Sequence, residues 1–404
     1  MGRGYSGSVR PVSVVLVSLA TALLGALAAI GIGTAAGWIG DTDTVIVGAD
    51  QRDSGDPIST PLRGAAKPLV GDDFEPAEIY EARSPGVVTI FAFFGDEQDD
   101  AAGASQGSGF VVSTEGLVLT NSHVVTTAGE TAGAARSART VYVQFADGDR
   151  VPGQIVGYDP FTDVAVLRVD GAAHELSAVP LGDSSAVVVG EPVAAIGSPF
   201  GNESSLTVGV VSATKRSIAS LTSIYNVVDA IQIDAPINRG NSGGPLFDAR
   251  GRVIGINAQI RTETGQNEGV GFAIPINAAK RSLAQLVQNG TVEYAYVGVT
   301  TSDLTPTLAR RFGYPVLRGA VVNVVRPRSP AARAGIRPAL REEEFNGLKV
   351  PVGGDVIVAI DGRVVRSADD VVRLVTGLTP GEVAVFSVLR DGKRARVAVR
   401  LGER

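Results

Sequence analysis

The sequence contains no cysteine, and its 404 residues include only two histidines, one methionine and one tryptophan. Without cysteine the chain can form no disulfide, use no thiolate nucleophile and bind no zinc through sulfur. Any histidine that acts as a base or a metal ligand must be His123 or His174. Catalysis that needs a histidine must therefore use one of these two residues.

The chain also lacks an excess of positive charge. It has 36 Lys and Arg residues against 42 Asp and Glu residues, which gives a formal net charge of -6. Nucleic-acid-binding domains usually present a basic surface to the phosphates. We therefore expect no nucleic-acid partner, and the length of the chain predicts more than one domain.

Charge is absent from one long stretch, residues 12–40. About 20 apolar residues are enough to cross a bilayer as a helix. Arg3 and Arg10 precede the stretch and three aspartates follow it closely. Under the positive-inside rule, residues 1–11 lie in the cytoplasm and the bulk of the chain lies outside it. The sequence predicts a single-pass anchor in the cell membrane with extracytoplasmic domains.

A cleaved signal peptide is the alternative interpretation of this stretch. Ala26-Leu27-Ala28 offers a small-residue cleavage site, but the apolar run continues well beyond it, which favours an anchor. Residues 41–75 are rich in Asp, Gly, Ser and Pro and show no sustained period. We expect this segment to be a flexible linker.

Short β-branched runs recur from residue 84 to 275, separated by Gly, Asp or Pro. This pattern predicts an all-β barrel or sandwich. Residues 277–289 instead show helical spacing, with Asn277 as the expected N-cap and Gly290 as the stop. We assign residues 76–290 to this first domain.

Residues 291–404 carry their own strand-like runs, "GAVVNVV", "DVIVAIDG" and "AVFSVLR", and one helix-like run, "SADDVVRLVTG". A stretch of about 100 residues with its own strands and helix is the size of a separate domain. We therefore predict a second, smaller domain.

One serine lies among three glycines in "RGNSGGPLF", residues 239–247. The pentapeptide around Ser242 fits the G-x-S-x-G elbow of α/β-hydrolases, where the catalytic histidine follows the serine. No histidine follows His174 here, so that triad is excluded. The order His, Asp, Ser remains open. The alternative is a tight turn or bulge in which Ser242 is only a turn residue.

His123 comes directly after an apolar strand in "GLVLTNSHVV" and can project from the strand end as a general base. A structural role is the alternative for a lone histidine. His174 lies in a polar connection, "DGAAHELSA", and reads as a surface residue. The first histidine is the predicted base.

Asp163 opens the apolar run "VAVL" and is the predicted acid, because a buried carboxylate there can accept the histidine N–H. Asp159, beside Pro160, is the reserve choice and reads as a turn residue. The glycines around Ser242 let the backbone bring the amides of Gly240 and Ser242 toward one developing oxyanion.

Four segments together, "TNSHVV", "TDVAVLRV", "INRGNSGGPLFD" and "GVGFAIPIN", resemble the HtrA (Deg) family of ATP-independent, trypsin-like serine proteases. The resemblance runs from about residue 76 to the end. It implies a mostly β fold with a two-barrel protease domain, a triad of His123, Asp163 and Ser242, and an oxyanion hole from the amides of Gly240 and Ser242. Neither a cofactor nor a metal is implied.

The specificity pocket is expected to be apolar. Six residues before the serine, where trypsins carry an aspartate, the chain has Pro236 followed by Ile237. By family similarity Ile237 and Ile260 line a pocket for small or medium aliphatic residues. The alternative is that both isoleucines are ordinary barrel core.

The second domain resembles the PDZ module of the family. Tyr296, Val297, Gly298 and Val299 match its carboxylate-binding loop, which offers backbone N–H groups to a peptide C-terminus while a strand edge takes up the peptide. The insertion at 341–352, "REEEFNGLKVPV", is expected to be a charged surface loop. One PDZ module after an anchor resembles the membrane-tethered members, and the family implies a homotrimer.

These expectations converge on a membrane-anchored serine endopeptidase that cleaves misfolded or regulatory proteins outside the cytoplasm, with PDZ occupancy acting on the loops of the active site. Two alternatives stay open. One is a chaperone or peptide-sensing scaffold with latent protease activity. The other is an esterase that uses the same acyl chemistry on non-peptide substrates.

Overall fold

The computed structural model describes residues 74–95, 103–127, 136–198, 205–220, 222–223, 226–238, 240–258 and 269–403. All of them belong to the compact unit that runs from Ala66 to Arg404. The predicted anchor, residues 12–40, and nearly all of the predicted linker lie outside the described residues. Within the described ranges, no helix has the length and apolar character needed to span a membrane.

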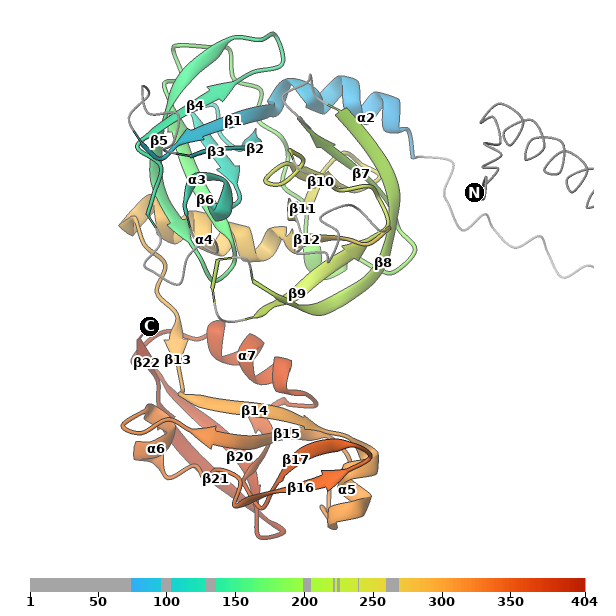
Figure 1. Ribbon diagram of the computed structural model, residues 1–404, viewed down its shortest axis with the longest axis vertical. Coiled ribbons are helices and arrows are strands. Elements are labelled where there is room, and N and C mark those ends of the chain that lie inside the picture. Colours follow the sequence, from blue (N-terminus) through green and yellow to red (C-terminus); the bar gives the residue numbers. More distant parts are fainter. Residues whose placement is uncertain are drawn as a thin grey trace, which may run out of the picture. The chain divides into compact units, whose positions relative to one another are not determined.

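The first barrel is a closed antiparallel sheet in the order β1-β2-β3-β6-β5-β4 (Figure 1). Strand β4 shows why such strands form a barrel, since Val141 and Val143 are buried while their neighbours are half-buried. The strands are β1 (Val87–Phe93), β2 (Ala104–Val111), β3 (Leu117–Thr120), β4 (Thr140–Gln144), β5 (Arg150–Asp159) and β6 (Val164–Val169).

The second barrel closes in the order β10-β11-β12-β9-β8-β7. Its strands are β7 (Pro192–Gly197), β8 (Ser205–Ala219), β9 (Asn226–Ile233), β10 (Pro245–Phe247), β11 (Val253–Ala258) and β12 (Gly271–Pro275). A shared hydrophobic core joins the two barrels, with Phe110 and Leu119 from the first packed in one cluster with Ile196 and Phe247 from the second. The predicted β-rich domain is thus confirmed as two barrels.

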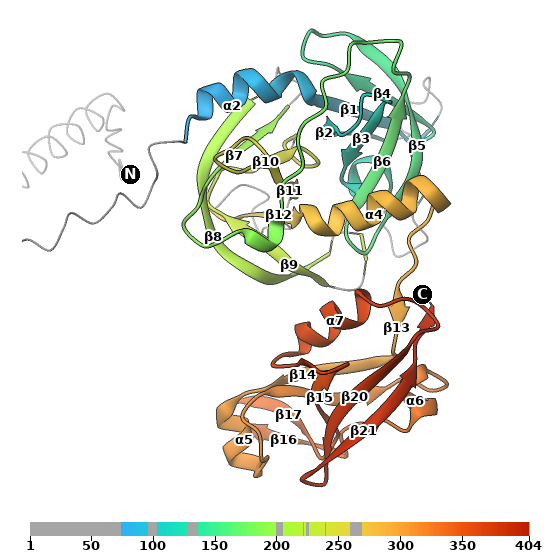
Figure 2. The same ribbon diagram turned by 180° about the vertical axis from the view of Figure 1, so that it is seen from behind.

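Helix α4 (Ile276–Asn289) packs against β5 and β6 of the first barrel and β11 and β12 of the second (Figure 2). Gly290 ends it in the left-handed conformation with φ 75°, as predicted. The predicted N-cap is wrong, because Pro275 holds that position and Asn277 lies inside the first turn. The Asn277 side chain instead donates to the Asp183 carboxylate at 2.6 Å.

Four shorter helices accompany the barrels within the described ranges. A helix α2 (Pro76–Arg83) and a 3-10 turn η1 (Ser84–Gly86) lead into β1, and α3 (Ser122–Val125) is a single turn after β3. A second 3-10 turn, η2 (Ser184–Ala186), precedes β7. The turn α3 is the element that positions the candidate base.

The C-terminal domain is built on one sheet in the order β14-β15-β18-β20-β21, with β19 paired to β18. Its buried core includes Ile357, Phe386 and Val388. Its elements are β13 (Ala295–Tyr296), β14 (Val299–Leu304), α5 (Pro306–Phe312), β15 (Gly319–Val325), α6 (Pro330–Ala334), β18 (Val356–Ile360), β19 (Arg363–Val364), α7 (Ala368–Thr376), β20 (Val383–Arg390), β21 (Lys393–Arg400) and β22 (Gly402–Glu403). The predicted strands and helix of this domain are confirmed.

The insertion at 341–352 is not a loop. It forms a β-hairpin of β16 (Arg341–Phe345) and β17 (Leu348–Val352). Asn346 and Gly347 make the connection with φ of 51° and 76°. Asn-Gly is a strong signal for a two-residue hairpin turn because both central residues need positive φ. The prediction of a charged surface segment stands, since most side chains of β16 are exposed, but its structure is regular.

Candidate active site

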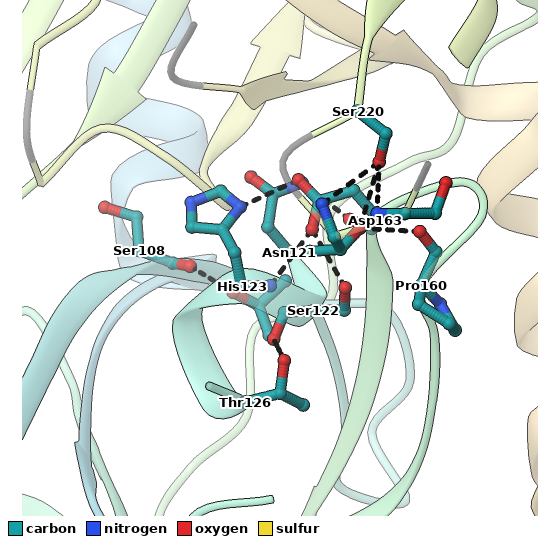
Figure 3. Close-up of polar contacts among 11 residues, drawn as sticks. Ser108, Asn121, Ser122, His123, Thr126, Pro160, Asp163 and Ser220 are labelled. Atoms are coloured by element: carbon teal, nitrogen blue, oxygen red, sulfur yellow. Dashed lines mark hydrogen bonds and ion pairs between the residues drawn. The ribbon is translucent and has the colours of Figure 1, made fainter. Parts of the chain in front are cut away.

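His123 and Asp163 lie at the ends of two strands, β3 and β6, that pair with each other. His123 lies in α3, directly after β3, and Asp163 immediately precedes β6, whose Ala165 pairs with Thr120 of β3. This register brings the imidazole Nδ1 to 2.7 Å from the Asp163 Oδ2 (Figure 3). A pairing between two short strands thus assembles the predicted acid and base from positions 40 residues apart.

Asp163 accepts hydrogen bonds from each residue of the segment 121–123, which carries the histidine. Its Oδ1 accepts from the Ser122 Oγ at 2.9 Å and from the His123 backbone amide at 3.0 Å, and its carbonyl accepts from the Asn121 Nδ2 at 2.8 Å. Its backbone lies in the left-handed region with φ 57°, which is uncommon for a residue with a side chain. The hydrogen bonds fix this carboxylate toward the imidazole.

The electrostatics of the pair suit a general base. Burial lowers the pKa of His123, but the charge of Asp163 and its hydrogen bond raise it, and the net pKa lies above the ordinary value. The side chain keeps 18% exposure, so it is open to a reacting group. Donation from Nδ1–H to Asp163 leaves the Nε2 lone pair of the neutral ring free to take a proton.

Ser242 lies between β9 and β10, in the second barrel, on a turn with two left-handed glycines, Gly240 at φ 104° and Gly243 at φ 86°. A Cβ on Gly243 would stand 2.2 Å from the Ser108 carbonyl oxygen and 2.3 Å from the Thr120 Oγ1. The serine turn therefore packs directly on β2 and β3 of the first barrel. The turn that carries the candidate nucleophile thus lies against the strand that leads to the candidate base.

Ser108 of β2 connects the serine turn to the first barrel by hydrogen bonds. The sequence did not predict this residue. Its Oγ donates to the Gly240 carbonyl at 2.5 Å and its amide donates to the Ser242 carbonyl at 2.8 Å. The same Oγ accepts from the Ser198 amide at 2.9 Å. Gly107, the residue before it, is part of the same close approach, because a Cβ there would lie 3.0 Å from the Ser242 carbonyl oxygen. No local sequence pattern points to this contact.

The Ser242 hydroxyl is buried, with the residue 4% exposed, and it has no hydrogen-bond partner. It therefore makes no hydrogen bond to His123 in this structure. Its backbone amide donates to no carbonyl among the described residues. An unpaired amide beside an unpaired hydroxyl is a place where an oxyanion could be accommodated.

The other predicted residues of the protease domain divide into three cases. His174 stacks on Phe145 with ring centroids 3.8 Å apart and contacts the Asp147 carboxylate at 3.0 Å, which fits a structural residue. Ile237 is 7% exposed and packs in the core of the second barrel. Ile260 lies outside the described residues.

Asp159, the reserve acid, contacts neither His123 nor Ser242 but lies fully buried in a hydrogen-bond network of its own. Two backbone amides of the turn that follows donate to it, as expected for a turn residue. Within the described ranges, no group of three or more acidic or histidine side chains is arranged to hold a metal ion.

The predicted carboxylate-binding loop leads into β14. The Val297 and Gly298 carbonyls accept from the amides of Ala331 and Arg326, each at 2.9 Å. Gly298 has φ 82°, and a Cβ there would stand 2.3 Å from the Ser329 Cβ, so only glycine fits. In the sheet order β14 is an edge strand paired with β15, and α7 packs beside it. An open edge next to a helix is the geometry of β-strand addition.

Comparison with known proteins identifies the two domains. The family model for a trypsin-like peptidase domain matches residues 107–256, and the PDZ domain model matches residues 295–401. A solved structure titled "HtrA-type protease AlgW with tripeptide" is 34% identical, covering 82% of this chain and 97% of that chain with a TM-score of 0.67. This chain belongs to the HtrA family.

Other serine endoproteases are similar over most of the chain. A "Probable periplasmic serine endoprotease DegP-like" from Pseudomonas putida is 39% identical over 335 residues, 83% of this chain and 62% of that protein. The solved serine endoprotease from Yersinia pestis is 28% identical with a TM-score of 0.57, covering 82% of this chain and 98% of that one. The chain spans about three fifths of the length of the first curated relatives it matches.

Proposed function

We propose that this HtrA-type chain is a serine endopeptidase that needs no ATP. The observation that carries the proposal is the His123–Asp163 contact of 2.7 Å beside a serine turn that packs on β3, the strand that leads to His123. Ser242 Oγ attacks a peptide carbonyl while His123 Nε2 takes its proton, and Asp163 stabilises the imidazolium. His123 then returns the proton to the leaving amine, and water hydrolyses the acyl-enzyme.

The oxyanion forms against the amides of Gly240 and Ser242. Ser108 supports this role only indirectly, because its hydrogen bonds to the carbonyls of both residues restrain the turn that carries the two amides. Loss of one oxyanion donor typically costs about 100-fold to 1,000-fold in rate. Ile237 and Ile260 provide an apolar pocket that favours small or medium aliphatic residues over basic ones.

The substrates we propose are misfolded or regulatory proteins, with the PDZ domain binding peptide C-termini through residues 296–299. Residues 12–40 anchor the chain in the cell membrane and place the protease outside the cytoplasm, in keeping with relatives described as periplasmic endoproteases. The assembly proposed from the family is a homotrimer.

The unpartnered Ser242 hydroxyl favours one second candidate, a peptide sensor or chaperone whose protease is latent until the PDZ domain is occupied. In that case peptide binding would precede formation of the Ser242–His123 hydrogen bond. The two candidates share the active site and differ in whether the unliganded chain cleaves protein.

The test is digestion of unfolded casein by the full chain without ATP, alone and with C-terminal peptides, with cleavage sites mapped by mass spectrometry. Ser242→Ala and His123→Ala should each abolish cleavage, whereas His174→Ala serves as the matched control and should not. Cleavage that survives in Ser242→Ala would overturn the proposal. Cleavage that appears only with peptide would favour the latent form.

A further inference from the structure

A second buried acidic residue lies four positions before the candidate catalytic aspartate. Asp159 is fully buried, and its Oδ1 accepts from the amides of Phe161 at 3.0 Å and Thr162 at 3.4 Å. Its Oδ2 accepts from the hydroxyls of Thr162 at 2.5 Å, Ser282 at 2.7 Å and Tyr294 at 2.5 Å. Five donors on one carboxylate are more than a turn requires, because an Asx turn needs only the backbone amides.

The donors come from three separate parts of the chain. Thr162 belongs to the turn itself, Ser282 lies on α4 and Tyr294 lies after α4, just before β13. The ring of Tyr294 also packs edge-on against Phe161, with centroids 5.2 Å apart. Asp159 therefore ties the turn to the helix that spans both barrels and to the segment that leads into the PDZ domain.

The turn held in this way ends at Asp163. Only three residues separate Asp159 from Asp163, and the Pro160 carbonyl is bound separately by the Thr222 Oγ1 at 2.6 Å. Asp163 itself has the unfavourable φ of 57°, so its conformation depends on its surroundings. A turn held at its first residue restricts the backbone that orients the last one.

Tyr294 is suited to be a permanent donor. Burial raises the pKa of its hydroxyl, and the charge of Asp159 raises it further, so the phenol keeps its proton throughout the range in which proteases work. The hydroxyl can therefore donate to Asp159 continuously. This contact adds a link from the PDZ side of the chain to the active-site turn.

We propose that Asp159 and Tyr294 form a positioning pair, in which the Tyr294 hydroxyl holds the 159–163 turn so that Asp163 stays aligned with His123. The pair rests on the proposed triad but touches neither substrate nor reacting atoms. Through Tyr294, the alignment of His123 depends on the conformation of the segment that precedes the PDZ domain.

The test uses the full chain with Tyr294→Phe, which removes the hydroxyl and keeps the ring against Phe161. Tyr158→Phe is the matched control, because it removes a hydroxyl from the residue next to Asp159 that is not one of its five donors. Ser282→Ala removes a second donor from another element and repeats the test independently.

The first readout is the pKa of His123, measured by NMR titration of chains labelled with carbon-13 at histidine Cε1. The chain has only two histidines, so His174 is an internal reference in the same spectrum. Asp163 raises the pKa of His123, so a loosened Asp163 should lower it in Tyr294→Phe and Ser282→Ala. The His174 titration should not move.

The second readout is steady-state hydrolysis. We expect kcat to fall by about tenfold to 100-fold in Tyr294→Phe, with KM within about twofold, because misplacement of a catalytic group affects the transition state. A His123 pKa that matches the wild-type value in both variants would overturn the positioning pair. The NMR readout needs no turnover, so an inactive wild-type chain would count against the proposed function alone.

Discussion

At the scale of single residues, the candidate site depends on the orientation of the Asp163 carboxylate. Asp163 receives one hydrogen bond from the imidazole and two from the segment that carries it. Three donors on one carboxylate leave few other orientations for it. The histidine is thereby kept in the tautomer whose Nε2 can accept a proton.

Asp163→Asn should lower kcat by about 10,000-fold, because an amide side chain favours the wrong histidine tautomer. The pH profile of kcat/KM should change as well. A raised His123 pKa means that the neutral base is lost at a higher pH as the solution is acidified. Without the carboxylate charge, the acidic limb of the profile should move to lower pH.

The control for this variant is Asp170→Asn, at an exposed aspartate just beyond β6. Its rate and pH profile should match those of the wild-type chain. An acidic limb that does not move in Asp163→Asn would show that some other group sets it.

Residue types and chain order were enough to predict that His123 and Asp163 contact each other, because the chain has only two histidines. Ser242 as the third member of a triad stays a prediction. Ser108 and the network around Asp159 could not be predicted in this way. Their contacts join residues 132 and 135 positions apart, and no local pattern reports such pairs. Asp159 was correctly read as a turn residue, but its burial depends on α4 and Tyr294.

At the scale of elements, the turn that carries Ser242 is buried and packs against the first barrel. Gly243 allows it to approach β2 and β3, because a Cβ would overlap the Ser108 carbonyl and the Thr120 hydroxyl. The turn is therefore shaped by the first barrel although it belongs to the second.

Gly243→Ala should abolish labelling of Ser242 by a fluorophosphonate and lower the melting temperature. Gly148→Ala is a close control, because Gly148 has φ 87° against 86° for Gly243 but nothing within 4 Å of its would-be Cβ. Both variants carry the same backbone strain, and only one carries the steric overlap. Equal loss of labelling in the two variants would show that strain alone is responsible.

Strands with strong alternation and helices with clear stops were predictable, whereas features set by neighbouring elements were not. The position of Gly290 followed from local helix chemistry. Asn277 was a reasonable N-cap by residue type, but the strand before it runs directly into the helix and its side chain finds Asp183 instead. The hairpin at 341–352 was predicted as a loop because its charged residues are typical of loops. The Asn-Gly turn signal within it was not used.

The edge strand β14 gives a prediction for peptide binding. A peptide with a free C-terminal carboxylate should bind at least about tenfold more tightly than its amide, because charge-assisted hydrogen bonds to backbone amides would be lost. Fluorescence anisotropy with both peptides measures the difference. Equal affinities would place the peptide elsewhere than at residues 296–299.

At the scale of the whole molecule, helix α7, which packs beside the edge strand β14, also contacts the protease domain. Arg373 of α7 donates to both carboxylate oxygens of Asp229 of β9, at 2.8 Å and 2.7 Å. Hydrogen bonds to Asp229 raise the pKa of Arg373, so the guanidinium stays charged. We expect peptide binding at the PDZ domain to act on the second barrel through this pair.

Arg373→Gln should reduce the ratio of peptide-stimulated to basal casein cleavage, because the charged contact between Nε and both carboxylate oxygens of Asp229 is lost. Arg363→Gln, at an exposed arginine of β19, is the control. The measurement is the initial rate with and without saturating peptide. A ratio equal to that of the control would exclude this pair from the coupling.

The proposed nucleophile and the proposed base are contributed by different barrels, and Ser108 of the first barrel bonds the Gly240 and Ser242 carbonyls of the second. We therefore expect the proposed active site to come apart as soon as either barrel begins to unfold. In a partly unfolded copy the activity would then be lost, and no active fragment would remain.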